Sequence, residues 1–439
     1  MTRPMAPEPN TVKRLRQKIK DGSANSDDYA LLGGCVFLKG DFSESVNLYQ
    51  RAIDVATTPV QKARVCIEFG WEYFEMGQEG EAQKLGQRAV GVIETERDCP
   101  EVWTCRGAAQ ALIAQVEWIT DAEKGTKAAH LALANLERGL GASTEFKGKA
   151  TGYFDAALLE NSLGNADMAI TLSEKYLQYE LHEWEKISGL TIYAEALRNA
   201  GRLVEAHLKL QEALQYARDH KTVLPNLYLE LGTTQCHMSR FNDAKHSFRQ
   251  ALLALEADPY GSKKANVFAR TYLSLAGVCY ELGDLKGAEA AYEEVVNLQD
   301  ERSPYHCAAL LGLGQSYRAA NTEAKARECF EKVLASHTAT EEERLTARVD
   351  LARSLYKSGE FVKAETAFQA LLQSCYEDDA RRANITLWLG HCYEGRGDYN
   401  KAMGNYEEVL AAHHAHPDDK TSAQEAVRRI SPSGQKTTH

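Results

Sequence analysis

A short pattern that recurs along the whole chain constrains its fold more than any other feature. Most copies have a glycine turn, and each has a small residue followed by small, aromatic or apolar residues four and seven positions later. The clearest copies begin at Gly283, Gly359 and Gly397 and read GDLKGA, GEFVKA and GDYNKA. The small residue, here called the anchor, recurs at 45, 82, 169, 206, 244, 288, 326, 364 and 402. A fixed period of 37 or 38 residues indicates an array of similar structural units.

Two spacings depart from this period. The gap between anchors 82 and 169 is about two periods long, which predicts a degenerate unit at 100–140 without a clean glycine turn. The gap between anchors 244 and 288 is 44 residues and predicts an insertion near 258–262. The chain is therefore expected to hold about ten units.

Each unit is expected to form a helical hairpin. Residues at offsets 0, 4 and 7 share one face of a helix, and the glycine supplies the turn before it. The internal prolines, such as Pro100 and Pro225, fall between these helical segments, and alternating strand patterns are absent. One hairpin cannot bury its own apolar faces, so the units must stack. We therefore expect an all-α fold.

On these residues the chain resembles the tetratricopeptide repeat family, over roughly Ser26 to Ala412. The resemblance implies a right-handed α-solenoid of stacked antiparallel helix hairpins, with the first helix of each hairpin lining a concave face. The family's usual unit has about 34 residues. The units here are longer, so the groove geometry of shorter relatives does not transfer.

The two ends of the chain differ from the repeats. Residues 1–25 are expected to form a basic tail or a capping helix, because Met1–Lys20 carries six Lys or Arg residues and one Glu. A contact of this segment with an acidic membrane or a nucleic acid remains open. The repeats should occupy 26–412, and 413–439 should form a cap and a disordered tail.

Composition narrows the function classes. The net charge of -11 and pI near 5.7 disfavour a nucleic-acid binder, and no apolar run is long enough to span a membrane. The ten cysteines form no CxxC pair, and no secretory signal is evident, which favours a reducing, cytoplasmic compartment.

No motif for chemistry stands out. The sequence has no phosphate-binding glycine loop, no GxSxG and no HExxH, so no cofactor, metal or catalytic residue is predicted. His413, His414 and His416 form the only histidine cluster, and a solvated loop is the favoured interpretation over a metal site. The sequence therefore predicts a non-enzymatic protein.

Alignment on the anchors predicts which side chains line the concave face. The first half of the array offers an aromatic set, Phe37, Trp71, Phe74 and Phe154, and Asn161 is a polar candidate beside it. The second half offers a basic set, Arg198, Arg270, Arg318, Arg353 and Lys357, interleaved with Tyr280 and Tyr356, and Asn199 is a further polar candidate. Arginine and tyrosine are enriched at binding hot spots, which favours a partner helix or extended segment with an acidic portion. The alternative is that the arginines pair with neighbouring acids.

The resemblance also allows one specific function to be tested. Some family members clamp the C-terminal carboxylate of chaperones with Lys and Asn one turn apart. The corresponding positions here include Ile67 with Trp71 and Thr191 with Glu195, which do not fit. The sequence therefore predicts a scaffold or adaptor for partner proteins within a larger assembly. A peptide-responsive regulator acting through a partner is the alternative, and self-association through the aromatic set is also open.

Overall fold

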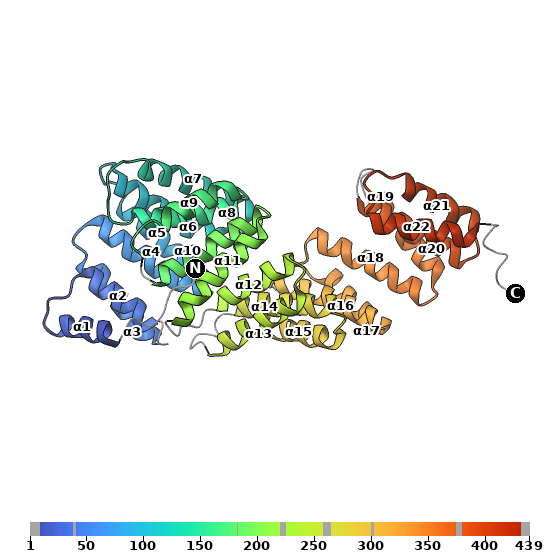
Figure 1. Ribbon diagram of the computed structural model, residues 1–439, viewed down its shortest axis with the longest axis horizontal. Coiled ribbons are helices and arrows are strands. Elements are labelled where there is room, and N and C mark those ends of the chain that lie inside the picture. The colour runs from blue at the N-terminus through green and yellow to red at the C-terminus, as the bar shows by residue number, and fades with distance from the viewer. Residues whose placement is uncertain are drawn as a thin grey trace. The chain divides into compact units, whose positions relative to one another are not determined.

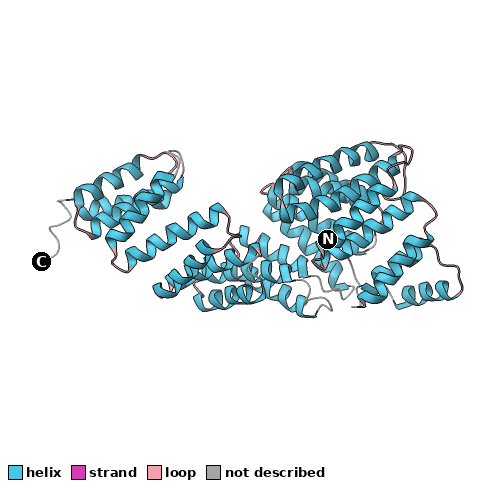
Figure 2. Cartoon of the chain, turned by 180° about the vertical axis from the view of Figure 1, so that it is seen from behind, coloured by secondary structure: helices cyan, strands magenta, loops and turns pink. Residues whose placement is uncertain are grey.

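A computed structural model describes residues 9–431, except 38–40, 182, 220–224, 258–264, 300–302 and 375–379. The regular elements in this part of the chain are all α-helices (Figures 1 and 2). The predicted insertion at 258–262 and the tail from 432 lie outside the described residues. The chain divides into two compact units, Met1–Thr271 and Tyr272–His439.

The first unit holds α1 to α13. Their bounds are α1 (Pro9–Lys20), α2 (Ser26–Phe37), α3 (Phe42–Val55), α4 (Pro59–Glu75), α5 (Glu79–Val92), α6 (Pro100–Thr120), α7 (Ala122–Leu140), α8 (Lys149–Ser162), α9 (Ala166–Tyr176), α10 (Glu183–Asn199), α11 (Leu203–Asp219), α12 (Pro225–His237) and α13 (Phe241–Ala257). The boundary between the units falls within α14 (Ala265–Glu281). The second unit continues with α15 (Leu285–Leu298), α16 (Pro304–Ala319), α17 (Glu323–Ala335), α18 (Glu341–Lys357), α19 (Phe361–Ser374), α20 (Ala380–Gly395), α21 (Tyr399–Ala411) and α22 (Pro417–Ile430).

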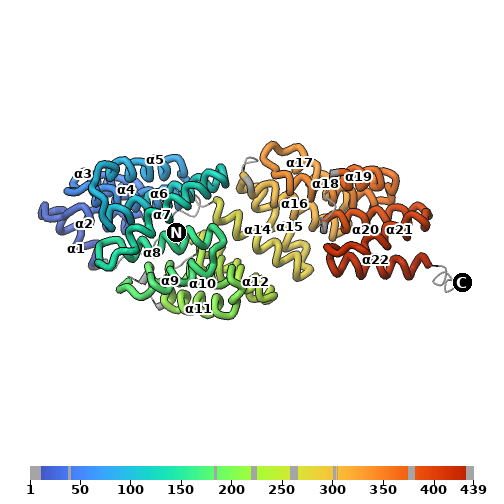
Figure 3. Tube along the Cα trace, turned by 90° about the horizontal axis from the view of Figure 1, so that it is seen from above, coloured from blue at the N-terminus to red at the C-terminus, as the bar shows by residue number. Residues whose placement is uncertain are grey.

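From α2 onward the helices pair as hairpins, with even-numbered first helices and odd-numbered second helices. First helices pack on their own second helices, as α4 does on α5 and α20 on α21. First helices of successive hairpins also touch: α2 with α4, α4 with α6, α6 with α8, and α8 with α10 in the first unit (Figure 3). The predicted α-solenoid of stacked antiparallel hairpins is confirmed, and the shared face of the first helices positions the site described below.

The glycine turns adopt the conformation that the repeat pattern predicts. Gly283, Gly359 and Gly397 have φ of 73°, 77° and 79°, the left-handed region that glycine enters without strain. The aspartate that follows two of these glycines caps the next helix, since Asp284 accepts from the Gly287 amide and Asp398 from the Lys401 amide. Sequence and local structure therefore agree at each end of the turn.

The anchors form the centre of each hairpin. Ala364 and Ala402 have no exposed surface, and the aromatic four residues later is equally buried at Phe368 and Tyr406. The facing first helix needs a very small residue here. A Cβ on Gly390 would lie 2.6 Å from Cε1 of Tyr406, so glycine lets the ring pack directly on the helix backbone.

Residues 100–140 fold as one long hairpin, α6 and α7, without a glycine turn. Asp121 replaces the glycine, and its side chain accepts from the amides of Glu123 and Lys124. Small residues then let the two helices approach closely. A Cβ on Gly107 would lie 2.6 Å from Cγ of Leu136, so larger residues would push α6 and α7 apart.

Helices α1 and α22 flank the hairpins of their units. In the first unit, Val12 and Leu15 of α1 are buried in a cluster with Leu32 and Cys35 of α2. In the second unit, the buried Ile430 of α22 belongs to the same core cluster as α20 and α21. None of the described helices is long and apolar enough to cross a bilayer.

Candidate functional site

The predicted aromatic set lies mostly in the core of the first unit. Phe37, Trp71 and Phe154 are 1%, 6% and 7% exposed, and only Phe74 is half-buried. Phe154 packs on Tyr176 with ring centroids 5.2 Å apart, and Trp71 meets the edge of Phe74 at 5.5 Å. These side chains fill the space between helices, so three of the four offer a partner almost no surface.

The polar residues predicted in the first unit bond to one another or to acids. Asn199 donates to the side-chain oxygen of the buried Asn161 at 2.9 Å. Nη1 of Arg198 donates to Oε2 of Glu230 at 2.5 Å, and Nη2 of the exposed Arg270 lies 3.9 Å from Oε1 of the same glutamate. The basic charge of this region is therefore compensated across adjacent first helices.

The second unit compensates its arginines more completely. Asp350 of α18 is 1% exposed and accepts from Nη1 of Arg318 at 2.5 Å, Nη1 of Arg353 at 3.1 Å and Nε2 of Gln315 at 2.8 Å. Arg353 also donates to the side-chain oxygen of Asn384 and stacks over the ring of Trp388 at 5.2 Å. Two of the predicted binding arginines are therefore held by one buried carboxylate.

The remaining predicted residues of the second unit also have neighbours. Nζ of Lys357 donates to the Arg318 carbonyl at 3.3 Å. Tyr356 packs against Trp388 with ring centroids 5.6 Å apart, and Tyr280 is half-buried on α14. The alternative that the sequence left open, pairing of the arginines with acids, describes Arg198, Arg318 and Arg353.

One register rule explains this pairing. The residue eight positions before one anchor meets the residue fourteen positions before the next, as in Arg198 with Glu230, Arg318 with Asp350, and the aromatic pair Tyr356 with Trp388. Members of the first two pairs are 32 residues apart in sequence. The sequence contains a signal for this pairing. An acid recurs fourteen positions before the anchor in four units, at Glu68, Asp155, Glu230 and Asp350.

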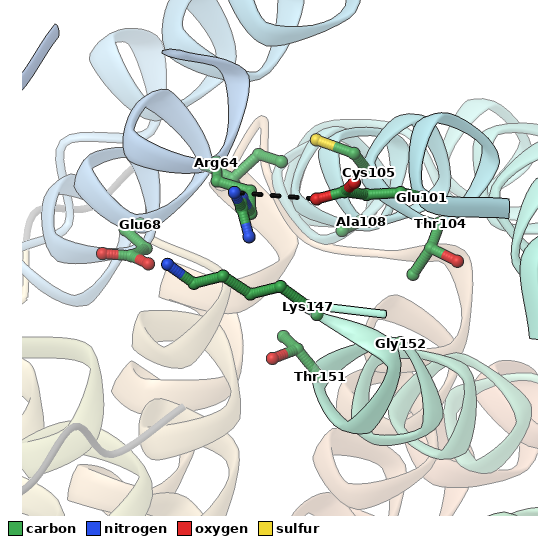
Figure 4. A pocket seen from close by; sticks show the side chains of 11 residues that line it. Arg64, Glu68, Glu101, Thr104, Cys105, Ala108, Lys147, Thr151 and Gly152 are labelled. Atoms are coloured by element: carbon green, nitrogen blue, oxygen red, sulfur yellow. Dashed lines mark ion pairs between the residues drawn. The ribbon is translucent and has the colours of Figure 1, made fainter. Parts of the chain in front are cut away.

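A pocket that the sequence did not predict lies between α4, α6 and α8 of the first unit (Figure 4). Its volume is about 80 Å³. It is lined by Arg64, Ile67 and Glu68 of α4, by Glu101, Thr104, Cys105 and Ala108 of α6, by Lys147 and Gly148 just before α8, and by Thr151 and Gly152 in its first turn. Because the three helices are consecutive first helices, the pocket lies on the face expected to bind partners.

The guanidinium of Arg64 is incompletely bonded in this pocket. Its Nε and Nη1 are buried and have no hydrogen-bond partner, and its Nη2 lies 3.6 Å from Oε1 of Glu101. Lys147, at the rim, has its Nζ 2.6 Å from Oδ2 of Asp27 on α2. Around a mostly apolar lining the pocket therefore carries two cations, Arg64 and Lys147, and two carboxylates, Glu68 and Glu101.

The inner wall of the pocket is apolar and unreactive. Ile67, Cys105 and Ala108 are buried there. Burial raises the pKa of the Cys105 thiol to about 12, so the nucleophilic thiolate is scarce at neutral pH. Gly152 permits the close approach of α8, since a Cβ there would lie 2.6 Å from Cγ2 of Thr104.

An unusual carboxyl group lies one helical turn beyond the pocket residue Thr151. Asp155 is 1% exposed, and both of its carboxyl oxygens are buried with no hydrogen-bond partner. Burial raises its pKa to about 8, so the group is mostly protonated at neutral pH. It occupies the acid position of the repeat, but the preceding hairpin is the degenerate one and supplies no arginine.

No sequence signal pointed to the pocket. Arg64 and Lys147 belong to hairpins on either side of the degenerate unit, and they line one pocket because α6 contacts both α4 and α8. In the second unit, His413 and His414 border a pocket of about 230 Å³ at the end of α21. Among the described residues, no group of three or more His, Cys, Asp or Glu side chains is placed to hold a metal ion.

Comparisons with known proteins agree with the repeat pattern. Models described as tetratricopeptide repeat match residues 267–339, 311–380 and 349–420, and one described as tetratrico peptide repeat matches 150–227. Together they cover more than half of the chain. No curated protein matches it.

Solved structures resemble the chain in fold. The apo form of the quorum sensor NprR from B. thuringiensis is 11% identical with a TM-score of 0.58, over 80% of this chain and 98% of that one. The Cut9–Hcn1 hetero-tetramer of the APC/C is 12% identical with a TM-score of 0.45, over 95% and 90%. The human IFIT1 dimer with PPP-AAAA is 17% identical with a TM-score of 0.42, over 92% and 93%.

Proposed function

The chain belongs to the tetratricopeptide repeat family, and from this premise we propose that it is a non-enzymatic scaffold or adaptor that binds an extended segment of a partner protein. Protein interaction is the general role that the repeat fold supports. The specific proposal places the segment along the first helices of the first unit, where α2, α4, α6, α8 and α10 contact one another in series. Such a surface suits a long partner that makes many small contacts.

The observation that carries this proposal is the partly unbonded Arg64 in the pocket between α4, α6 and α8. Buried polar groups in folded proteins nearly always have partners, so one without a partner on a binding face points to a ligand. The arginines of the basic set are already paired with Glu230 and Asp350. The proposal therefore does not require an acidic partner segment.

A reducing, cytoplasmic compartment is part of the proposal. The nine described cysteines are free thiols, as expected of a chain that folds without disulfides. The likeness to the quorum sensor concerns fold alone, so the peptide-responsive regulator considered from the sequence stays an alternative prediction.

Site-specific photo-cross-linking tests the proposal. A photoreactive amino acid replaces Thr151, which is exposed at the pocket rim, and in a matched variant it replaces Leu208, which is 56% exposed on the second helix α11. Both full-length proteins are irradiated in lysate of the native cells, and the products are mapped by mass spectrometry. We expect one partner segment to be cross-linked at position 151 and not at 208.

Cross-linking of the same partner at position 208 with equal or greater yield would place the binding surface on the second helices. That outcome would contradict the proposal.

A further inference from the structure

The pocket between α4, α6 and α8 contains unused hydrogen-bond donors. Nε and Nη1 of Arg64 are shielded from solvent without a partner, while Nη2 faces Glu101 at 3.6 Å, longer than a hydrogen bond. Arginine has only donors in its head group, so these two atoms require an acceptor. A ligand that reaches this guanidinium therefore has to present an acceptor atom to it.

The charges around the pocket select a neutral acceptor. A carboxylate or phosphate near Arg64 would also approach the carboxylates of Glu68 and Glu101. Lys147 offers limited compensation, because its ammonium already lies 2.6 Å from Asp27. Like charges at such short range repel strongly where water is partly excluded. An uncharged carbonyl oxygen accepts from the guanidinium without this repulsion.

The rim of the pocket also carries hydrogen-bond acceptors, which could receive an N–H group of the same ligand. The carboxylates of Glu68 and Glu101 and the hydroxyl of Thr151 border the opening that Arg64 faces (Figure 4). An amide carries a carbonyl acceptor and N–H donors a short distance apart, which matches this mixture. The volume of about 80 Å³ suits the end of one side chain rather than a drug-sized ligand.

We propose that this pocket is an amide-binding subsite, in which Arg64 donates to the carbonyl oxygen of an amide group of the bound segment and the rim acceptors receive its N–H. The apolar wall of Ile67, Cys105 and Ala108 packs against the adjoining methylene carbons. The inference rests on the proposed function, because it names the chemistry recognised at one point of the partner-binding face. The amide belongs to an asparagine or glutamine side chain or to the main chain.

Selection from a displayed library of random dodecapeptides tests the subsite. The library is selected on the full-length wild type, on Arg64→Met and on Arg88→Met, a matched control at an exposed arginine of the second helix α5. Thermal unfolding of each variant first establishes that it is folded. We expect Asn or Gln to be enriched at one position on the wild type and on Arg88→Met, and not on Arg64→Met.

Synthetic peptides from the selection then identify the group. For a side-chain amide, replacing it with Leu or with Asp should weaken binding to the wild type by roughly tenfold or more, and to Arg64→Met by less than about twofold. If the amide is a main-chain amide, neither Asn nor Gln should be enriched. Replacing one peptide bond of the bound peptide with an ester should then weaken its binding to the wild type and change its binding to Arg64→Met by less than about twofold. Either pattern supports the subsite and assigns its source.

Three results would overturn it. Enrichment of Asp or Glu, or tighter binding of the Asp peptide than of its Asn parent, would show that the pocket prefers a charged group. If replacing the amide weakened peptide binding equally in the wild type and in Arg64→Met, the amide would bind outside this pocket. The proposed function would then stand without the subsite. Failure of any peptide to be enriched on the folded wild type would count against both proposals.

Discussion

Two buried aspartates occupy the same position of the repeat and have opposite surroundings. Asp155 of α8 and Asp350 of α18 both lie fourteen residues before an anchor, and both are 1% exposed. Asp350 accepts from Arg318, Arg353 and Gln315, whereas the carboxyl oxygens of Asp155 have no hydrogen-bond partner. Arg318 and Gln315 lie on α16 of the preceding hairpin and Arg353 on the same helix as Asp350, so the preceding hairpin supplies two of the three donors that Asp155 lacks.

The same contrast applies to the arginines. Arg318 comes from a regular hairpin and is bonded to the acid of the next one, while Arg64 faces a hairpin that lacks the regular pattern and keeps two donors unused. Repeat regularity thus completes polar pairs in the second unit. Next to the irregular hairpin of α6 and α7, two donors of Arg64 and both carboxyl oxygens of Asp155 lack hydrogen-bond partners.

The largest expected effect comes from removing Asp350, the aspartate that accepts three side-chain hydrogen bonds. Asp350→Ala leaves the side chains of Arg318 and Arg353 without their shared carboxylate. Truncating one partner of a buried ion pair costs about 3–5 kcal/mol. We therefore expect the free energy of unfolding, measured by urea titration followed by circular dichroism, to fall by about that amount.

The matched control for this change is Glu407→Ala, at an exposed position of α21, where we expect a change within about 0.5 kcal/mol. A loss below about 1 kcal/mol in Asp350→Ala would show that the bonded aspartate contributes no more than a surface residue, and the contrast with Asp155 would disappear.

The second prediction concerns the aspartate without partners. The pKa of Asp155 in the folded protein is about 8, well above its unfolded value near 3.9, so between these pH values the folded state binds the extra proton. Stability from this group is fully present below the unfolded pKa and is lost as pH rises through the folded pKa, by up to about 1.4 kcal/mol per pH unit. Asp155→Asn removes this titration.

The measurement is the melting temperature of the wild type and of Asp155→Asn at pH 5, 7 and 9. We expect the wild type to lose stability relative to the variant as pH rises. Asp54→Asn, at an exposed position of α3, serves as control and should follow the wild type. Parallel pH profiles for wild type and Asp155→Asn would mean that Asp155 is not the titrating group.

The sequence predicts the hairpins well because their determinants are local. A glycine able to take positive φ, an aspartate cap and an anchor with an aromatic four residues later all lie within about ten residues, as at Gly397, Asp398, Ala402 and Tyr406. These features fix turn, helix start and packing together, so the fold follows from the pattern.

The candidate site is not local, and the sequence predicts it poorly. The aromatics Phe37 and Trp71 were expected on the groove, but a rotation of the helix by one residue turns such side chains into the core, where they are buried. The pairing of Arg318 with Asp350 depends on contacts between hairpins. The pocket at Arg64 depends on three of them, including the one whose pattern is degenerate.

The smallest expected effect is that of Arg64→Met on stability, and it is compared with that of Arg318→Met. Arg318→Met removes a hydrogen bond to a buried carboxylate, which is worth about 1.5–3 kcal/mol. Arg64→Met removes only the 3.6 Å approach to Glu101 and also relieves two buried donors that lack partners, so its free energy of unfolding should change by less than about 1 kcal/mol. Urea titration of the two variants side by side measures the difference. If Arg64→Met cost as much as Arg318→Met, Arg64 would be a structural residue of the first unit. A near-neutral result instead means that folding does not account for the placement of this partly buried guanidinium, as the proposed subsite expects.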